Sequence, residues 1–243
     1  MTTSFLTRLF DLVSPRSCAI CGYRLSVHES VLCATCHLHL PFTYYWLSPY
    51  DNPMARLFWG RIPLAGGVPP QRPNSLERAS ALFFYQPHAP ASKIIYALKY
   101  HGQRSIGTAM GAIAARTMGS DFFGGIDIIV PVPLTRRRLW SRGYNQSLEI
   151  AKGVSAVTGI PVDNELVSRV AFAGSQTKRR LWERTVNVEN VFALTAPERA
   201  AGRHILIIDD VVTTGATIAS CARQLCLAPD VSISVLSLGF TKE

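Results

Sequence analysis

The stretch Ile205–Thr217, which reads ILIIDDVVTTGAT, constrains the fold of this chain more than any other. Its first four residues are apolar without alternation, as expected of a parallel strand that is covered on both faces. Asp209 and Asp210 follow at the expected carboxyl end of this strand, and Ile218–Leu225 has helical spacing. The sequence therefore predicts a buried strand, a tight turn and a helix. An ordinary β–turn–α unit would explain the strand and the helix, but not the residues between them.

The turn between this strand and this helix has the composition of a phosphate-binding loop. Backbone N–H groups in such a turn and at a helix N-terminus converge on an anion. Threonine hydroxyls add donors, and the glycine lets the backbone approach closely. The two carboxylates can accept from sugar hydroxyls or hold a divalent cation. A sugar phosphate is the ligand that combines these groups, and its predicted contacts are Asp209, Asp210, Thr213, Thr214, Gly215, Ala216 and Thr217.

Strands and helices alternate over the last two thirds of the chain. Apolar, β-prone runs predict further strands at 79–85, 127–132, 166–170 and 231–238. Helical periodicity predicts helices at 90–100, 105–118 and 145–157. This alternation is typical of an α/β fold in which helices flank a parallel sheet. Because ligands of such sheets bind at the carboxyl ends of the strands, the loops there should carry the chemistry.

Two of these segments are rich in cations. Beyond the strand at 127–132, a predicted basic loop contains Arg136, Arg137, Arg138, Arg142, Asn145 and Gln146. The long stretch 171–191 is predicted to be a mobile cationic lid, with Gln176, Lys178, Arg184 and Asn187 as its candidate binding residues. Arginines without intervening acids suit a diphosphate or a nucleic-acid backbone. Long solvated arginines on an idle loop would give the same pattern.

The amino-acid composition indicates which class of ligand and which cellular compartment suit the chain. The 243 residues include 25 basic and 16 acidic ones, a formal charge of +9. This balance suits a polyanionic ligand such as a nucleic acid, a nucleotide or a sugar diphosphate, although an idle basic surface would have the same charge. No run of eighteen apolar residues predicts a membrane span. Six cysteines without a convincing secretion signal favour a reducing compartment, so we expect a cytoplasmic protein.

Four of the cysteines form two CxxC pairs separated by eleven residues: Cys18, Cys21, Cys33 and Cys36. Each pair can present two thiolates to one tetrahedral ion, so together they predict a closed, structural Zn²⁺ site. Two disulfides are the alternative. Cysteine substitution should release the metal and unfold this module while leaving ligand binding largely intact. Three units are predicted: an N-terminal helix and zinc module at 1–45, a proline- and aromatic-rich linker at 46–75 that packs over the last unit, and an α/β domain at 76–243.

The motif at Ile205–Thr217 resembles, position by position, the signature with which type I phosphoribosyltransferases bind phosphoribosyl pyrophosphate (PRPP). Over nearly the whole chain, the sequence is similar to the ComF family, phosphoribosyltransferase-like proteins associated with competence and DNA uptake. The elements that carry this resemblance are the four-cysteine finger, Leu98–Tyr100, Pro131–Leu134, Arg142–Gln146, Arg169 with Gln176, Arg184 with Asn187 and Phe192, and Ile205–Thr217. Tyr144 departs from the phenylalanine of many relatives, and Trp46–Asn74 has no counterpart in the resemblance.

The resemblance implies a phosphoribosyltransferase-like protein that binds PRPP with Mg²⁺. Asp209 and Asp210 would hold the ribose hydroxyls, and the threonine loop would hold the 5-phosphate. Lys99, Pro133 and Leu134 are further expected PRPP contacts, and Arg184 is expected to act with the two aspartates in catalysis. The alternative is a non-enzymatic factor that binds nucleotides or single-stranded DNA, with a helicase of the uptake machinery as its partner. A transcriptional regulator is less favoured, because the sequence shows no helix-turn-helix pattern.

Overall fold

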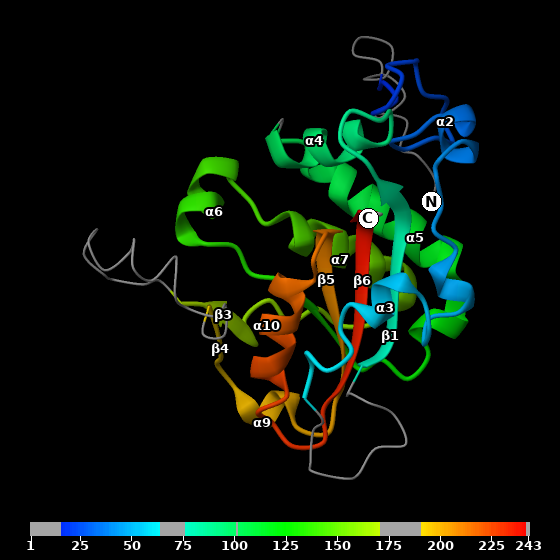
Figure 1. Ribbon diagram of the computed structural model, residues 1–243. Coiled ribbons are helices and arrows are strands. Elements are labelled where there is room, and N and C mark those ends of the chain that lie inside the picture. Colours follow the sequence, from blue (N-terminus) through cyan, green and yellow to red (C-terminus); the bar gives the residue numbers. More distant parts are fainter. Residues whose placement is uncertain (1–15, 64–75, 101, 171–190, 242–243) are drawn as a thin grey trace.

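A four-stranded parallel sheet forms the centre of the protein. The computed structural model describes residues 16–63, 76–100, 102–170 and 191–241. The strand order is β1-β6-β5-β2, and every neighbouring pair is parallel. The strands are β1 (Leu76–Tyr85), β2 (Ile128–Pro131), β5 (His204–Val212) and β6 (Ser232–Thr241) (Figure 1). The predicted parallel sheet flanked by helices is confirmed.

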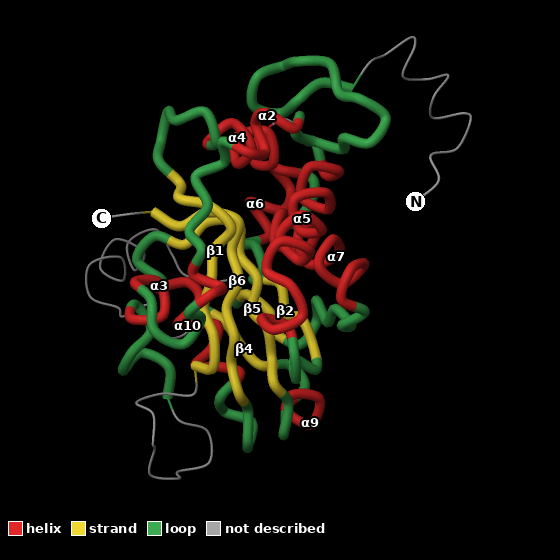
Figure 2. The backbone as a smooth tube through the Cα atoms, turned by 90° about the vertical axis from the view of Figure 1, so that its right-hand side faces the viewer, coloured by secondary structure: helices red, strands yellow, loops and turns green. Residues whose placement is uncertain are grey.

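Helices cover both faces of this sheet. The helices are α3 (Pro53–Arg56), α4 (Ser92–Tyr100), α5 (Arg104–Phe123), α7 (Gln146–Thr158) and α10 (Ala216–Leu225). In Figure 2 the sheet lies between α5 and α7 on one side and α3 and α10 on the other. Ile205 and Ile207 of β5 belong to the core on the α10 side, and Leu206 and Ile208 belong to the core on the α7 side. The apolar run does not alternate because both of its faces are buried.

The helices α5 and α7 pack at unusually short range, which fixes α7 beside the sheet. A Cβ added to Gly153 of α7 would lie 2.0 Å from the Thr108 carbonyl oxygen of α5, and one added to Gly111 of α5 would lie 2.1 Å from the Ile150 carbonyl oxygen. Neither distance leaves room for a side chain. The small residues thus let the two backbones touch, and the α7 N-terminus is held at the carboxyl end of β2.

The strand predicted at 166–170 does not join the parallel sheet, and the prediction was wrong on this point. Instead, β3 (Val167–Arg169) pairs antiparallel with β4 (Phe192–Leu194) in a separate two-stranded sheet. Beyond β2, the described part of the chain adds to the main sheet an isolated parallel bridge between Ile129 and Val162. An antiparallel pair needs no helical crossover, so two short segments can satisfy each other's backbone hydrogen bonds locally. The stretch 171–190 therefore connects β3 to β4; it lies outside the described residues.

Part of the predicted linker packs against the sheet. Its elements are a short 3₁₀ turn, η1 (Tyr45–Leu47), and α3. Met54, Phe58 and Ile62 are at most 2% exposed and belong to the same core as α10. The Asn52 amide donates to the Ala79 carbonyl of β1 (2.9 Å) and caps α3 through its oxygen. The part of this stretch that the structure describes packs over the α/β domain as expected, and residues 64–75 lie outside the described part.

The amino end of β5 contains a half-buried histidine with a defined tautomer. His204 Nδ1 lies 3.1 Å from the Gly125 carbonyl oxygen, so this nitrogen donates, and Nε2 accepts from the Ser234 hydroxyl (2.8 Å). Burial, assisted by the positive charge of Arg78, lowers the pKa of His204. The folded protein thus binds this proton less tightly than the unfolded chain does. Stability should be lost as the pH falls below about 6.5, where the unfolded histidine becomes charged.

We expect His204→Gln to reduce this acid sensitivity. Glutamine cannot be protonated, so the fall in melting temperature between pH 7.5 and pH 5.5 should be smaller than in the wild type. Thermal denaturation followed by circular dichroism measures it, and the exposed His28→Gln serves as the control. Parallel pH profiles for wild type and His204→Gln would contradict the assignment.

Candidate functional site at the carboxyl rim of the sheet

The two aspartates lie inside β5, not after its end as the sequence predicted. The last β2 residue, Pro131, pairs with Ile208, whereas β5 continues along β6 to Val212. From Asp209 onward β5 therefore has only one neighbouring strand of the sheet. The carboxylates remain at the carboxyl rim, because β2 has already ended beside them.

Asp209 is held by donors from two directions. Its Oδ1 accepts from the Ser147 hydroxyl in the first turn of α7 (3.0 Å) and from the backbone N–H of Asp210 (2.9 Å). Burial and the negative charge of Asp210 raise the pKa of Asp209 to about 7, although these hydrogen bonds and Lys99 oppose the shift. The orientation of this carboxylate is thus fixed in advance by α7.

Asp210 is paired with a lysine from the last turn of α4. Lys99 Nζ lies 3.1 Å from Asp210 Oδ1, and both side chains are largely removed from solvent. The same turn of α4 is held by Tyr144, whose buried hydroxyl donates to the Leu98 carbonyl. The tyrosine that departs from the family resemblance therefore supplies a hydrogen bond that phenylalanine could not make. The structure brings Lys99 to the acidic pair across more than a hundred residues of sequence.

The predicted phosphate loop follows the end of β5, a few residues after the aspartates. Gly215 is the N-cap of α10 in the left-handed conformation (φ 71°), and no side chain caps this helix. A Cβ at Gly215 would lie 2.9 Å from the Phe58 ring. The Arg61 guanidinium donates to the Thr214 carbonyl oxygen (2.6 Å). The loop is thus supported from behind by the segment that follows α3, while Thr213, Thr214 and Thr217 are exposed.

The support of this loop by Phe58 and Arg61 was not predicted. Residues 46–75 were predicted to be a linker that packs over the α/β domain, and none of them was assigned to the site. The aromatic content of that stretch was the available signal, because a free tether does not need buried rings. Its partner could not be identified from spacing alone.

The motif Arg142–Gln146 serves mainly to position its neighbours. Asn145 accepts from the Ser147 N–H as the N-cap of α7, and its amide donates to the Val132 carbonyl (3.0 Å). Gln146 is 1% exposed, and its oxygen accepts from Arg142 (2.8 Å). Asn145 thereby anchors the segment that leads to Pro133 and Leu134, which are half-buried at the same rim.

The predicted basic loop is a helix, α6 (Arg136–Arg142), and the prediction was wrong on its conformation. Thr135 caps it by accepting from the Arg138 N–H (3.2 Å), and Gly143 ends it with a φ of 74°. A threonine before the run and a glycine after it are standard helix boundaries that the sequence contained. Arg136, Arg137 and Arg138 are exposed, and Arg142 is half-buried.

Two further residues near this rim, Trp140 and Arg169, were not predicted to belong to the site, although Arg169 is part of the family resemblance. Trp140 of α6 is 92% exposed between the arginines. Arg169 of β3 is half-buried over the Phe192 ring (5.2 Å), and its Nε has no hydrogen-bond partner among the described residues. Burial and the charge of Arg138 lower the pKa of Arg169, while the charge of Asp209 opposes this shift. The predicted lid residues Gln176, Lys178, Arg184 and Asn187 lie outside the described part of the chain.

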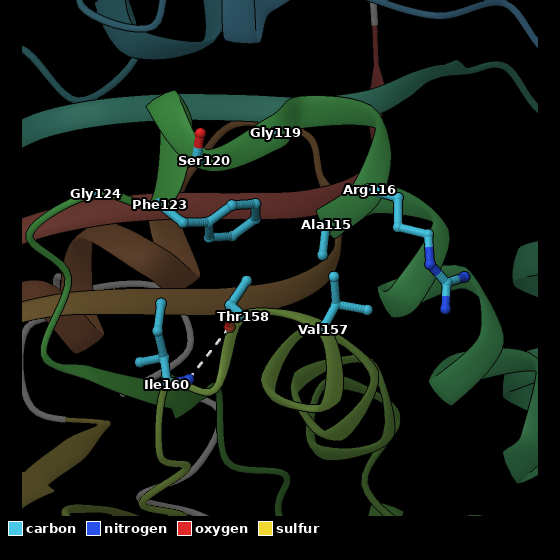
Figure 3. A pocket seen from close by; sticks show the side chains of 9 residues that line it. All are labelled: Ala115, Arg116, Gly119, Ser120, Phe123, Gly124, Val157, Thr158 and Ile160. Atoms are coloured by element: carbon cyan, nitrogen blue, oxygen red, sulfur yellow. Dashed lines mark hydrogen bonds between the residues drawn. The ribbon is translucent and has the colours of Figure 1, made fainter. Parts of the chain in front are cut away.

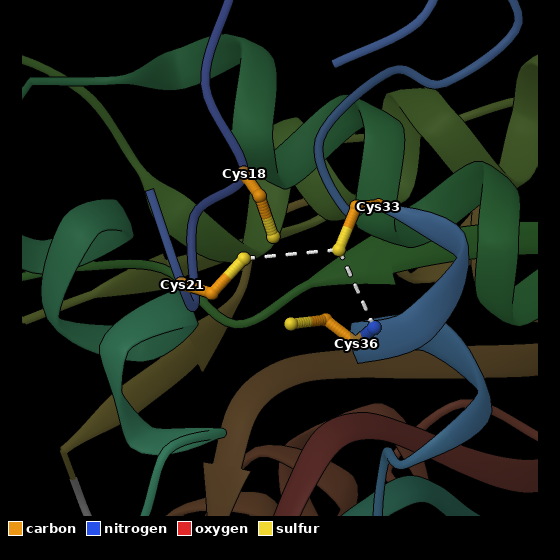
Figure 4. A group of neighbouring side chains, drawn as sticks. All are labelled: Cys18, Cys21, Cys33 and Cys36. Carbon is orange, nitrogen blue, oxygen red and sulfur yellow. Dashed lines mark hydrogen bonds between the residues drawn. The ribbon is translucent and has the colours of Figure 1, made fainter. Parts of the chain in front are cut away.

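The four predicted metal ligands converge in the N-terminal module. The sulfur atoms of Cys18, Cys21, Cys33 and Cys36 all lie within 4.8 Å of one another, and none is in a disulfide (Figure 4). Cys21 Sγ and Cys33 Sγ are 3.7 Å apart, close to the ~3.8 Å between thiolates on a tetrahedral zinc with bonds of about 2.3 Å. Burial opposes ionisation of Cys18, but N–H groups of Cys21 and Cys33 lower its pKa to about 6. This quartet fits a zinc ion.

Local hydrogen bonds shape both knuckles. Gly22, with a φ of 75°, turns the first, and the Cys33 sulfur caps α2 (Ala34–Leu38) by accepting from the Cys36 N–H. Glu29 closes the intervening loop by accepting from the N–H groups of Ser26 and Ala34.

The zinc module packs on α4. Leu32 and Leu40 of the module belong to one continuous core with Ile95 and Leu98. Lys93 of α4 donates to the Ile20 carbonyl between the first two cysteines (2.9 Å). Figure 1 shows α2 and α4 together at the end of the sheet where the strands finish. The module therefore supports the helix that carries Lys99.

A larger hollow lies away from this rim, between the ends of α5 and α7. It measures about 460 Å³. In Figure 3, Phe123, Val157 and Ile160 face it, and Arg116 extends away at its margin. Both helices end there, before the chain enters the amino ends of strands. In a parallel sheet this is the end opposite the usual ligand site, so the carboxyl rim is the candidate functional site.

Among the described residues, no helix has the length and apolarity needed to cross a bilayer.

Comparisons with known proteins agree with the sequence resemblance. No protein-family model matches the chain. It is 35% identical over 162 residues to the DNA utilization protein YhgH of Escherichia coli K12. The aligned region covers 64% of this chain and 68% of YhgH. The chain is 30% identical over 130 residues to the competence protein ComFC of Bacillus subtilis 168, covering 52% and 50%.

The similarity to solved structures is more distant. The adenine phosphoribosyltransferase of Leishmania tarentolae matches 79% of this chain and 88% of its own, at 13% identity and a TM-score of 0.34. The fold is therefore established from the strand order and connections described above. From the extent of its identity to YhgH, this chain belongs to the ComF family of competence and DNA-utilization proteins.

Proposed function

We propose that the carboxyl rim binds PRPP together with Mg²⁺. The observation that best supports this proposal is that Asp209 and Asp210 of β5 lie just before the N-terminus of α10, which no side chain caps. Gly215, in the left-handed conformation, joins the loop after the aspartates to this helix. A helix N-terminus attracts a phosphate through its N–H groups and its dipole. Oriented carboxylates next to it suit the vicinal hydroxyls of a pentose. The family resemblance supplies the identity of the sugar phosphate.

Each group at the rim then has a role toward this ligand. The loop Thr213–Thr217 would hold the 5-phosphate through its N–H groups and exposed hydroxyls. Asp209 and Asp210 would accept from the ribose hydroxyls and lie close enough to share in holding the cation. Bound Mg²⁺ would neutralise charge on the pyrophosphate. Lys99, Arg169 and the loop at Pro133 and Leu134 would face the remaining phosphates, with Arg184 closing over them.

The transfer reaction that fits this site is a displacement at C1 of the ribose. The bond from C1 to the pyrophosphate oxygen breaks, a bond from an acceptor nitrogen to C1 forms, and the nitrogen loses its proton. The pyrophosphate leaves with the electron pair, so cations placed around it stabilise the charge that develops. Lys99 is already oriented by Asp210 and needs little reorganisation to contribute.

Isothermal titration calorimetry of the full chain with PRPP and Mg²⁺ tests the proposed ligand. We expect saturable binding that weakens when Mg²⁺ is omitted. Pyrophosphate release with a panel of purines, pyrimidines and amines then tests transfer. An absence of PRPP binding in the presence of Mg²⁺ would refute the proposal, whereas binding without pyrophosphate release would leave a PRPP-binding protein that is not an enzyme.

A second candidate function is binding of single-stranded DNA through α6. The relatives are named for DNA utilization and competence. Trp140 on α6 is almost fully exposed among arginines that are themselves exposed. An aromatic side chain with flanking cations is the usual means of holding single strands without sequence preference. In that setting the zinc module would present a surface to a helicase partner.

Neutralising Arg136, Arg137 and Arg138 to glutamine should weaken binding of a labelled oligonucleotide and flatten its salt dependence. Three lost phosphate contacts should reduce the slope of log K against log salt by about 2. Trp140→Ala should weaken binding without changing this slope, because stacking releases no counterions. Fluorescence anisotropy at low salt measures both effects.

Matched variants control for general effects of charge and aromatic loss. Arg116→Gln and Arg203→Gln remove exposed cations elsewhere, and Trp59→Ala removes a tryptophan that is 44% exposed. PRPP binding should survive all the α6 variants. Oligonucleotide affinity that is the same in the α6 variants and in the controls would exclude α6 as the binding surface.

A further inference from the structure

One face of α4 presents two tyrosines beside the acidic pair. Tyr96, Lys99 and Tyr100 are spaced i, i+3 and i+4, so they share a face of the helix. Because Lys99 reaches Asp210, this face is turned toward the proposed sugar-phosphate site. Tyr96 is 42% exposed and Tyr100 is 68% exposed. Their ring centroids are 5.9 Å apart, and the ring planes are inclined by 32°.

The rings of Tyr96 and Tyr100 are exposed even though α4 as a whole is packed against the protein core. The opposite face of α4 buries Ile94, Ile95 and Leu98 against the sheet and the zinc module. The helix therefore places its aliphatic residues inward and leaves its two aromatic residues at the rim. A third tyrosine, Tyr85, ends β1 nearby and is half-buried. Burial, followed by the charges of Tyr96, Tyr100 and Asp210, raises its pKa, which places all four groups in one neighbourhood.

We propose that Tyr96 and Tyr100 form a stacking subsite for a planar nitrogen base beside the sugar-phosphate site. Open aromatic faces recognise a flat π system, and such stacking is tolerant of which base is bound. Lys99 is engaged by Asp210 and so does not occupy the tyrosine faces. The hydroxyl tips keep this surface polar, which favours a heteroaromatic ring over an aliphatic ligand. This inference extends the proposed function by naming the class of acceptor.

Two sources could supply such a base. One is a free nucleobase, whose ring nitrogen would be the acceptor in the displacement at C1. The other is a base at the end of a DNA strand. The shared chemistry is the planar ring, and the two sources are separated by testing free bases and an oligonucleotide in parallel.

The test uses the full chain and measures ring binding and PRPP binding separately. Saturation-transfer NMR and calorimetry follow adenine, hypoxanthine, uracil and a five-residue thymidine oligonucleotide, each with and without Mg²⁺ and PRPP. The variants are Tyr100→Leu, Tyr96→Leu and Tyr100→Phe. Tyr23→Leu is the matched control, since Tyr23 is 71% exposed in the zinc module. Circular dichroism confirms that each variant folds.

We expect Tyr100→Leu to bind the base or the oligonucleotide about tenfold more weakly, as loss of one stacking partner would do. Tyr100→Phe should retain binding, because it keeps the ring, and Tyr23→Leu should match the wild type. PRPP affinity should stay unchanged in the leucine variants. Binding of free bases would identify an acceptor subsite, and binding of the oligonucleotide alone would identify a strand-end subsite.

Failure of this inference can be distinguished from failure of the proposed function. If PRPP binds but no ring in the panel does, or if rings bind Tyr100→Leu as well as wild type, the tyrosine subsite is refuted and PRPP binding stands. If PRPP does not bind but rings bind in a Tyr100-dependent manner, the subsite stands and the proposed PRPP site is refuted.

Discussion

Replacing Cys33 with serine should release the metal and destabilise the protein by several kcal/mol, because binding of structural zinc supplies folding free energy. Cys33 both belongs to the quartet and caps α2, so its loss removes a ligand and a helix cap together. Metal analysis should fall from about one zinc per chain to none, and the melting temperature should fall with it. Cys226→Ser, at the end of α10 and outside the quartet, is the matched control.

The structure changes one expectation about this variant. From the sequence we expected PRPP binding to survive loss of the zinc module. The module packs on α4, and α4 carries Lys99. PRPP affinity should therefore fall as well, even if the sheet remains folded. Unchanged PRPP affinity in a zinc-free protein would show that α4 holds its position without the module, and retained zinc would refute the quartet as its ligands.

Asp210→Asn and Thr214→Val should each weaken binding of Mg-PRPP strongly. Asp210 is 8% exposed and is oriented by Lys99, so its hydrogen bonds to a sugar would be charge-assisted and preorganised. Loss of such a bond costs about 1.5–3 kcal/mol, which corresponds to a roughly 10- to 150-fold higher Kd. Thr214→Val removes a hydroxyl from the phosphate loop while keeping the shape of the side chain.

Calorimetry with PRPP and Mg²⁺ measures both losses. The matched control is Asp230→Asn, because Asp230 is exposed before β6 at the amino end of the sheet. The affinity of Asp230→Asn for PRPP should equal that of the wild type. If both rim variants bind PRPP with unchanged affinity while remaining folded, the assignment of the rim as the sugar-phosphate site would be wrong.

The sequence by itself determined the features that depend on short separations along the chain. The apolar run at Ile205–Ile208, the two aspartates and the threonine loop are contiguous, so their order fixes a strand, a rim and a helix start. The CxxC pairs likewise fix two knuckles, because two residues between cysteines allow both sulfurs to face one point. The helix α6 is also encoded locally, since Thr135 and Gly143 delimit it, although the run of arginines between them was interpreted as a loop.

Only the tertiary structure decided which distant residues meet at the rim. Lys99 reaches Asp210, Ser147 reaches Asp209, and Phe58 lies behind Gly215, each pair joined by the packing of separate elements. Sequence periodicity indicates which face of an element is buried but not which partner buries it. The pairing of β3 with β4 was hidden for the same reason, because short strands can satisfy their backbone groups with any compatible neighbour. Spacing along the chain specified the chemistry of each group, and the close packing of helices on the sheet decided which groups act together.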